Sequence, residues 1–354
     1  MGIAAAATLV ACGDVNEQPR ADARVPDAET CVPESDQAFC ARQASGNACE
    51  VHAGLDNCGV QRDADCGACT AGSGCVAGAC KTPVCTTFAY TQSAFVADFT
   101  RAGLEDSLAA VTSNGQVLVV LQAPTGTPGG CFSFRVMIAD ETSPGAGTYT
   151  SLDATPVLQN HQLYTHQEGH AITADGLTLI AQSSDRKRWL TTTRSAVKLV
   201  DFGTPSDLDF ALINAQIAAA DATLRAPVIS DDGLEFIYKV ESSDADLRGT
   251  YASVRASAAV PFPAGTKQGP PVADYEFPTA LSSDRLTLFM FDSFRGRALT
   301  RTSTSQPFTN PNADGDPPQI SAWHHKPLAD CRTLLAMSSG GGCQNEDVVR
   351  LVRE

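Results

Sequence analysis

The residues most suggestive of chemistry are three histidines in the stretch NHQLYTHQEGH. His161, His166 and His170 are separated by four and three residues, and Glu168 lies between the last two. On a helix, this spacing would place the side chains on one face, where they could ligate a metal ion. The surrounding residues are more typical of a loop and a strand, so the sequence favours polar loop residues and predicts no metal site.

A second group, Trp323-His324-His325, directly precedes a predicted hairpin near the end of the sequence. Side chains at such a position could contact a ligand, because indole and imidazole rings combine an apolar face with a polar edge. A buried histidine with a structural role is the alternative that the sequence favours. These three residues are therefore candidate ligand contacts and not catalytic ones.

The stretch NPNADGDP resembles the first half of a calcium-binding loop. Asn310, Asn312 and Asp314 stand at alternate positions and Gly315 is sixth, but position twelve would be Ser321. A calcium loop of this kind needs a bidentate glutamate there. Calcium is thus a weak expectation, and a turn between two strands is favoured; no other cofactor is expected.

Motifs that would identify an enzyme are missing from the sequence. It contains no Gly-x-Ser-x-Gly elbow, phosphate-binding loop or His-Glu-x-x-His. Acidic residues are numerous, yet the distance between two carboxylates cannot be derived from their positions in a sequence. No catalytic residue is nominated.

Composition narrows the range of partners. The chain has 354 residues, a formal net charge of −15, 43% hydrophobic residues and 18% charged residues. A negative protein repels phosphate backbones, so a nucleic-acid partner is not expected. The hydrophobic content suits a packed core. No run of apolar residues is long enough for a membrane-spanning helix.

The first residues, MGIAAAATLVACGD, resemble the signal peptide of a bacterial lipoprotein. Small residues lead into Leu-Val-Ala-Cys, which is similar to the lipobox in which the cysteine becomes the lipidated residue. The resemblance implies export and a lipid on Cys12; a chance cysteine is the alternative. No Lys or Arg precedes the apolar run, so the true start could lie further upstream. Residues 1–12 are thus the expected signal peptide, and the polar residues 13–30 a flexible tether.

Nine of the thirteen cysteines are crowded into residues 31–85, which contain few large apolar side chains. Such a segment needs cross-links in place of a hydrophobic core, so disulfides are expected. Zinc is the alternative, but only Cys66 and Cys69 have a Cys-x2-Cys spacing, and His52 is not placed to complete a site. The segment also resembles a cysteine-rich module of exported bacterial proteins, which implies a stalk or spacer.

The pairing of these cysteines is only partly constrained by their number. Eight cysteines between residues 31 and 80 could close the module among themselves, in any of many connectivities. We expect Cys85 to pair with Cys131, and Cys331 with Cys343, because setting Cys12 aside leaves an even number.

A repeated turn organises the rest of the chain. Five windows align on it, at steps of 61, 57, 52 and 46 residues. A large apolar residue follows each turn, and a Ser or Thr precedes the first four. The windows are LAAVTSNGQVLVV, HAITADGLTLIA, PVISDDGLEFIY, TALSSDRLTLFM and PLADCRTLLA.

The pattern is that of tight β-hairpins. Asn-Gly and Asp-Gly supply the positive φ of two-residue turns, and alternate apolar residues then face a core. Arg285 and Cys331 replace the glycine, which requires another turn type or about 1 kcal/mol of left-handed strain. A second strand follows the last four windows, and its sequence includes an Arg: WLTTTR, TYASVR, ALTRTS and VVRLVR. Phe202, Phe262 and Phe308 then open a loop.

The motif P-x-h-S-x-D-G-L-x-h, in which h is apolar, together with the following strand resembles the TolB-like, WD-type repeat of bacterial envelope proteins. The resemblance implies that residues 86–354 form a β-propeller, with five blades favoured over six. A strand within residues 86–100 should complete the last blade. The predicted fold class is all-β, with a small disulfide-rich module at residues 31–85 before the propeller; a twisted β-sandwich is the alternative.

The leading functional hypothesis is an exported protein, lipid-anchored in the cell envelope at the outer membrane or on its periplasmic side. Its propeller would bind an envelope protein or polysaccharide without catalysis, and the lipid would be its only membrane contact. A hydrolase or lyase acting on extracellular glycans, with acids in the channel, is the first alternative. A purely structural surface protein is the second. Carboxylates converging in a central pocket would favour the enzyme, whereas Ser, Thr and apolar groups would favour binding.

Overall fold

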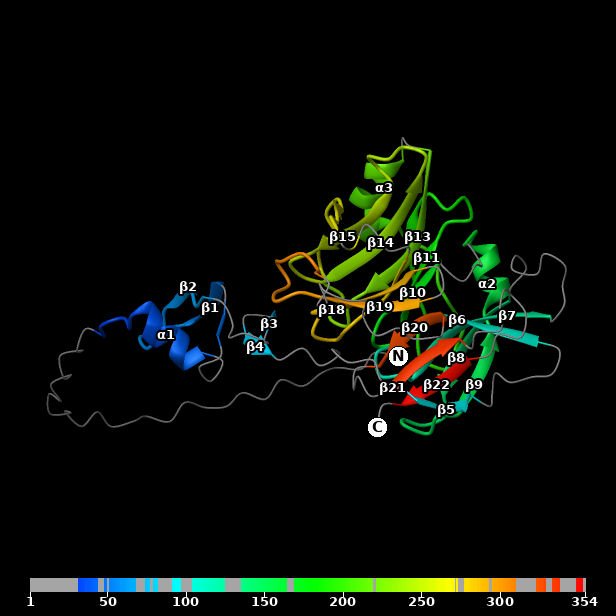
Figure 1. The fold of residues 1–354 in the computed structure, drawn as a ribbon, viewed down its shortest axis with the longest axis horizontal. Helices are drawn as coiled ribbons and strands as arrows, with labels where there is room; N and C mark the ends of the chain where they lie inside the picture. Colours follow the sequence, from blue (N-terminus) through cyan, green and yellow to red (C-terminus); the bar gives the residue numbers. More distant parts are fainter. Residues whose placement is uncertain are drawn as a thin grey trace, which may run out of the picture.

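The computed structural model is an all-β chain of mostly antiparallel sheets (Figure 1). Within its described part, no helix combines the length and hydropathy needed to cross a membrane. The structure describes residues 31–43, 48–49, 51–67, 74–76, 79–81, 91–96, 104–124, 135–163, 169–218, 221–270, 272, 277–292, 295–309, 323–328, 333–337 and 348–352.

The cysteine-rich segment forms a small unit, drawn in blue to one side of the larger body in Figure 1. One short helix packs on a two-stranded hairpin, and a second small hairpin follows. Its elements are α1 (Asp36–Arg42), β1 (Val51–Leu55), β2 (Gln61–Asp65), β3 (Gly74–Val76) and β4 (Ala79–Lys81).

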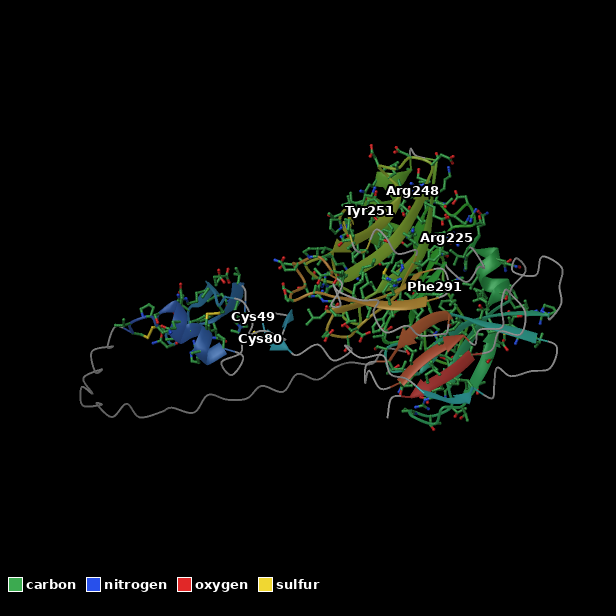
Figure 2. All side chains as sticks on the ribbon, viewed as in Figure 1. Cys49, Cys80, Arg225, Arg248, Tyr251 and Phe291 are labelled. Atoms are coloured by element: carbon green, nitrogen blue, oxygen red, sulfur yellow. A yellow bond between two sulfur atoms is a disulfide. The ribbon has the colours of Figure 1, made fainter. Side chains whose placement is uncertain are left out.

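Disulfides cross-link this unit, as the cysteine spacing predicts. Cys31 is bonded to Cys58 and Cys40 to Cys66, so the two closed loops overlap in sequence. Cys49 and Cys80, labelled in Figure 2, are disulfide-bonded as well, and an isolated β-bridge pairs the residues that precede them, Ala48 and Ala79. The zinc alternative is wrong for Cys66, whose sulfur is already in a disulfide.

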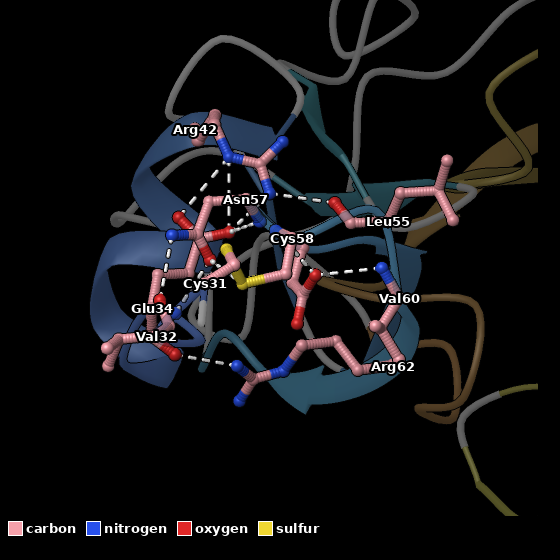
Figure 3. The surroundings of a disulfide bond; sticks show 10 residues. Cys31, Val32, Glu34, Arg42, Leu55, Asn57, Cys58, Val60 and Arg62 are labelled. Atoms are coloured by element: carbon pink, nitrogen blue, oxygen red, sulfur yellow. Dashed lines mark hydrogen bonds and ion pairs between the residues drawn. A yellow bond between two sulfur atoms is a disulfide. The ribbon is translucent and has the colours of Figure 1, made fainter. Parts of the chain in front are cut away.

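Hydrogen bonds and ion pairs surround the first disulfide and help to stabilise this unit, which has a small hydrophobic core (Figure 3). The Glu34 carboxylate accepts hydrogen bonds from the Arg42 guanidinium and, at 3.0 Å, from the Asn57 backbone N–H. The hydrogen bond with Arg42 lowers the pKa of Glu34. Phe39 is fully buried beneath the guanidinium groups of Arg42 and Arg62, the largest apolar group that this unit encloses in its described part.

The rest of the described chain forms five sheets of three or four strands, which we number 1 to 5. Sheet 1 contains β6 (Leu104–Val111), β7 (Val117–Pro124), β8 (Arg135–Glu141) and β9 (Tyr149–Asp153). Sheet 2 contains β10 (His170–Ile172), β11 (Thr178–Gln182) and β12 (Trp189–Thr193). Sheet 3 contains β13 (Ala222–Ile229), β14 (Glu235–Ser242), β15 (Gly249–Val254) and β16 (Thr266–Lys267).

The last two sheets complete the set, and the strand expected within residues 86–100 is found as β5, paired with the final strand β22. Sheet 4 contains β17 (Phe277–Leu281), β18 (Thr287–Asp292) and β19 (Arg295–Thr300). Sheet 5 contains β20 (Trp323–Pro327), β21 (Thr333–Met337), β22 (Val348–Val352) and β5 (Thr91–Phe95). The short helices are α2 (Thr155–Asn160), η4 (Leu208–Phe210) and α3 (Ala211–Ile217).

Consecutive sheets pack face to face. Separate apolar clusters fill the spaces between sheets 1 and 2, 2 and 3, 3 and 4, and 5 and 1. The first strands also contact one another in sequence: β6 with β10, β10 with β13, β13 with β17, β17 with β20, and β20 with β6. Five separate sheets arranged in this way do not fit the β-sandwich alternative, which needs two stacked sheets.

The repeated turns differ from the two-residue type that the sequence predicts. In the first, Gly115 N–H donates to Thr112 O at 2.8 Å, and Thr112 N–H donates to Val117 O at 3.0 Å, so four residues lie in the loop. Gly115 follows the turn with a φ of +74°. Longer hairpin loops built around such a turn likewise place a glycine in the left-handed region. Arg285 has a φ of +60° in the equivalent loop and carries the expected strain.

The Ser or Thr before each of the first four repeated turns connects the two ends of the loop by hydrogen bonds. Thr112 Oγ1 donates to Asn114 Oδ1 at 2.7 Å and accepts a hydrogen bond from Val117 N–H at 3.0 Å. The same pair of bonds recurs at Thr173, Ser230 and Ser282. It also recurs at Ser183, between β11 and β12, where the sequence SSDR repeats that of residues 282–285.

Candidate functional site

A small cavity of ≈ 50 Å³ lies where the first strands of the five sheets meet. Small and β-branched residues of β6, β10, β13 and β17 form most of its lining, which lets the strands approach closely. The polar groups that reach it are Ser113, Asp231, Thr279 and Lys326.

Lys326 is the least expected of these groups, because its ammonium group lies in the interior. It projects from β20, and only 8% of the residue is exposed. Its Nζ donates a hydrogen bond to the backbone carbonyl of Thr279 on β17, which ties sheet 5 to sheet 4. Burial lowers the pKa of Lys326 to about 7, since removal from water disfavours the charged amine.

Asp231 approaches the same cavity from the turn after β13. Burial raises the pKa of its carboxyl group, while a hydrogen bond with Ser113 acts in the opposite direction. Ser113 belongs to the turn after β6, so this contact spans from sheet 1 to sheet 3. Among the described lining residues, Asp231 is the one carboxylate.

The arginine that directly follows the third strand of sheets 2, 3 and 4 has a defined structural role. Its Nε donates to the carbonyl of the last residue in that sheet's repeated turn, at 2.8 Å for Arg194, 2.7 Å for Arg255 and 2.9 Å for Arg301. Two of these arginines also form an ion pair with a buried carboxylate of the preceding sheet. Arg194 pairs with Asp140, and Arg301 pairs with Glu235. The arginine of the repeat therefore links neighbouring sheets through an ion pair at these two positions.

The buried phenylalanines complete this connection. The guanidinium carbons of Arg255 and Arg301 each lie 4.3 Å from a ring centre, of Phe262 and Phe308 respectively. A cation placed over an aromatic face is attracted to it. Phe202, the third of the predicted loop residues, is also buried.

The described members of the histidine group, His161 and His170, lie in different elements and do not form a shared site. His161 ends α2, and its Nε2 lies 3.3 Å from the carbonyl of Phe202; His170 is buried on β10. His166 and Glu168 fall outside the described residues. Within those residues, no three His, Cys, Asp or Glu side chains are grouped to hold a metal ion.

Trp323, His324 and His325 lie on β20, immediately before Lys326. Their side chains are outside the described set, so their role as ligand contacts stays a prediction. Sequence reasoning placed these residues directly before the last hairpin and missed Lys326; a lysine between the histidine pair and the start of that hairpin was the available signal.

The remaining predicted site residues also fall outside the described residues. They are the lipidation site Cys12, the disulfide candidates Cys85, Cys131, Cys331 and Cys343, and the calcium candidates Asn310, Asn312 and Asp314.

Comparison with known proteins gives only distant similarities. No protein-family profile and no curated protein matches the chain. TolB from Acinetobacter baumannii is 10% identical over 71% of this chain and 54% of that one, with a TM-score of 0.36, so the chain spans about half of that protein. The α-L-arabinofuranosidase Arb93A from Fusarium graminearum is 13% identical over 72% of this chain and 77% of that one, with a TM-score of 0.39.

A third similar structure is the β-propeller domain of Cps50 (Swd1) from Myceliophteria thermophila. It is 12% identical over 71% of this chain and 83% of that one, with a TM-score of 0.33. Values this low do not assign the chain to any of these families.

Proposed function

We propose that this chain is an exported, lipid-anchored binding protein of the bacterial cell envelope. Residues 86–354 form a five-bladed β-propeller that binds an envelope protein or polysaccharide without catalysis. The lipid on Cys12, the tether at residues 13–30 and the disulfide module at residues 31–85 hold the propeller away from the membrane.

The contacts between first strands support the propeller. Each of the five first strands touches the next, and β20 touches β6, as expected for sheets arranged around one axis. The pairing of β22 with β5 joins the two ends of the repeat region within one sheet, which is how a propeller resists opening.

The size of the central cavity is the observation that carries the binding function. Sites for small molecules enclose about 300–1,000 Å³, whereas this cavity offers ≈ 50 Å³. It has room for a few water molecules and cannot enclose a sugar ring. A glycosidase also needs two carboxylates flanking its substrate, and Asp231 is the one carboxylate among the described lining residues. Recognition would therefore occur on the outer surface.

Cross-linking in intact cells tests the binding function. The full chain, isolated after cross-linking, should carry one recurrent envelope protein or polysaccharide, and the purified chain should bind that partner again. Release of sugars from envelope glycans by the purified chain, abolished by Asp231→Asn, would instead establish the enzymatic alternative.

Cell fractionation with Cys12→Ser tests the anchor. The unchanged chain should remain with the membranes and show the mass of a diacylglyceryl group, whereas the variant should not. Membrane association that survives Cys12→Ser would contradict lipid anchoring.

A further inference from the structure

The cysteine-rich unit exposes its large aliphatic side chains to solvent. Among the side chains described there, Phe39 is buried, whereas every valine and leucine is exposed. They are Val32, Val51, Leu55 and Val60, with exposed fractions of 78, 69, 55 and 58%. A spacer gains no stability from apolar groups in water, whereas contiguous exposed apolar groups are typical of interaction surfaces.

Two of these side chains belong to one row on the hairpin of β1 and β2. Successive side chains of a strand point to opposite faces of its sheet. The inner face packs on α1, since the Arg62 guanidinium carbon lies 5.2 Å from the ring centre of Phe39. On the outer face, β1 presents Val51, Ala53 and Leu55, all three exposed, as a continuous apolar row.

A second row, on β2, lies beside the first and is acidic. The cross-strand pairs on the outer face are Val51 with Asp65, Ala53 with Asp63, and Leu55 with Gln61. Directly opposed side chains of paired strands share a face and are close neighbours. Asp63 and Asp65 are both exposed, and neither forms an ion pair in the described part of the chain. The outer face therefore combines an apolar row with two unbalanced negative charges.

These charges restrict what can cover the face. A second copy of the chain would bring its own two aspartates to the interface, and each copy has a net charge of −15. Residues 13–30, which precede the unit, contain five acidic and two basic residues and are repelled as well. An anionic membrane surface is excluded for the same reason. A protein segment that carries apolar and basic side chains matches both rows.

We propose that the outer face of the β1–β2 hairpin binds a segment of a partner protein in which apolar side chains stand beside Lys or Arg. The apolar side chains cover Val51, Ala53 and Leu55, and the basic groups lie against Asp63 and Asp65. The cysteine-rich unit is then a recognition module as well as a spacer. This role is independent of the binding function proposed for the propeller.

Selection from a phage-displayed library of random peptides against the purified full chain tests the proposal. Peptides that bind the unit should combine Lys or Arg with large apolar residues, and added salt should weaken their binding. Leu55→Ser removes the largest side chain of the apolar row and should weaken binding by about tenfold or more.

Leu208→Ser is the matched control for this variant. Leu208 is 72% exposed on the propeller and stands between Asp207 and Asp209, so it is also an exposed leucine beside acidic residues. The control should leave peptide binding unchanged. Peptides that lose binding to Leu208→Ser and keep it to Leu55→Ser would place the interaction on the propeller and overturn the proposal.

A change in the sign of the charge gives a second readout. Asp63→Lys with Asp65→Asn makes the outer face positive, and the asparagine keeps the side-chain oxygen that accepts a hydrogen bond from Gly67 N–H. Selection against this double variant should yield Asp or Glu in place of Lys or Arg, with the apolar residues retained. A melting curve and mapping of the disulfides check that both sets of variants are folded.

Two further results would overturn the proposal. One is selection of the same peptides by the chain and by its charge-reversed variant, which would show that the aspartates take no part in recognition. The other is a dimer of the full chain, detected by analytical ultracentrifugation, that dissociates in Leu55→Ser, because a second copy would then be the occupant of this face.

Discussion

Arg194 and Asp140 form a two-point ion pair between sheets 2 and 1. Arg194 Nη2 lies 2.7 Å from Asp140 Oδ1, and Nη1 lies 3.0 Å from Oδ2. Neither side chain is exposed to solvent. The arginine also binds the carbonyl of Gly176, so one guanidinium group holds the end of its own sheet against the neighbouring one.

Removing one member of this ion pair should destabilise the folded chain. Asp140→Ala leaves the Arg194 guanidinium buried without its partner, so we expect a loss of about 3–5 kcal/mol in the free energy of unfolding. Urea denaturation measures the change. The control is Glu241→Ala, which breaks a partly exposed ion pair with Arg225 and should cost about 0–1 kcal/mol. Similar losses in the two variants would show that burial does not set the strength of the pair.

Two glycines of the repeated turns allow the cost of a positive φ to be measured separately from the cost of a steric clash. Gly176 and Gly233 have φ values of +70° and +69°, but a Cβ atom at Gly176 would lie 2.6 Å from Val117 Cγ2. The nearest atom at Gly233 would be 3.5 Å away. Gly233→Ala should therefore cost about 1 kcal/mol of unfolding free energy, whereas Gly176→Ala should cost about 1–3 kcal/mol more.

A double variant checks this explanation. If the conflict with Val117 is real, Gly176→Ala and Val117→Ala together should cost less than the sum of the two single changes. Strict additivity would mean that the backbone conformation alone accounts for the loss.

Local patterns in the sequence predicted the hairpins because a turn and its strands are adjacent in the chain. The positions of the first four repeated turns, the strands expected after the last four windows and a strand within residues 86–100 are confirmed, although Arg194, Arg255 and Arg301 directly follow their strands. The fifth turn lies outside the described residues. The length of the loops was wrong, because an Asp-Gly pair fits both the two-residue turn and the longer loop. The Ser or Thr hydroxyl that closes the longer loop was visible in the alignment, but its role was not.

Contacts between distant residues could not be derived in this way. Arg301 and Glu235 are 66 residues apart, and nothing local in the sequence links them. The same limit applies to Lys326, whose burial depends on the neighbouring sheet. It also applies to the disulfides: Cys31 pairs with Cys58 across a fold that the spacing leaves open among many connectivities.

The proposed closure of the propeller can be tested through β5. Val96 is buried, packs in one cluster with Leu108 and Leu335, and donates its N–H to Val348 O at 2.9 Å. Replacing residues 91–96 by a Gly/Ser segment of equal length should lower the free energy of unfolding by at least about 2 kcal/mol, from the loss of Val96 burial alone. Thermal denaturation followed by circular dichroism gives the comparison.

Removal of residues 31–81 is the control for that experiment, because it deletes the disulfide unit and keeps β5. The β-sheet transition should then occur at the same temperature as in the full chain. An unchanged transition after loss of β5 would contradict closure through this strand.

Lys326 predicts a pH dependence of stability with a defined sign. Its pKa is about 7 in the folded chain, against 10.5 as its ordinary value. Between these values the unfolded chain binds more protons, so the free energy of unfolding should rise with pH by at most about 1.4 kcal/mol per unit. Lys326→Met removes the cost of burying the amine. Its gain in the free energy of unfolding over the unchanged chain should be largest at or below pH 7 and shrink towards pH 10.

Urea denaturation across this pH range measures the difference. Lys187→Met, at an exposed lysine, is the control for the lost charge. Asp231, the other ionisable group in the cavity, is present in all three proteins. A gain independent of pH would mean that Lys326 keeps its proton in the folded chain throughout this range.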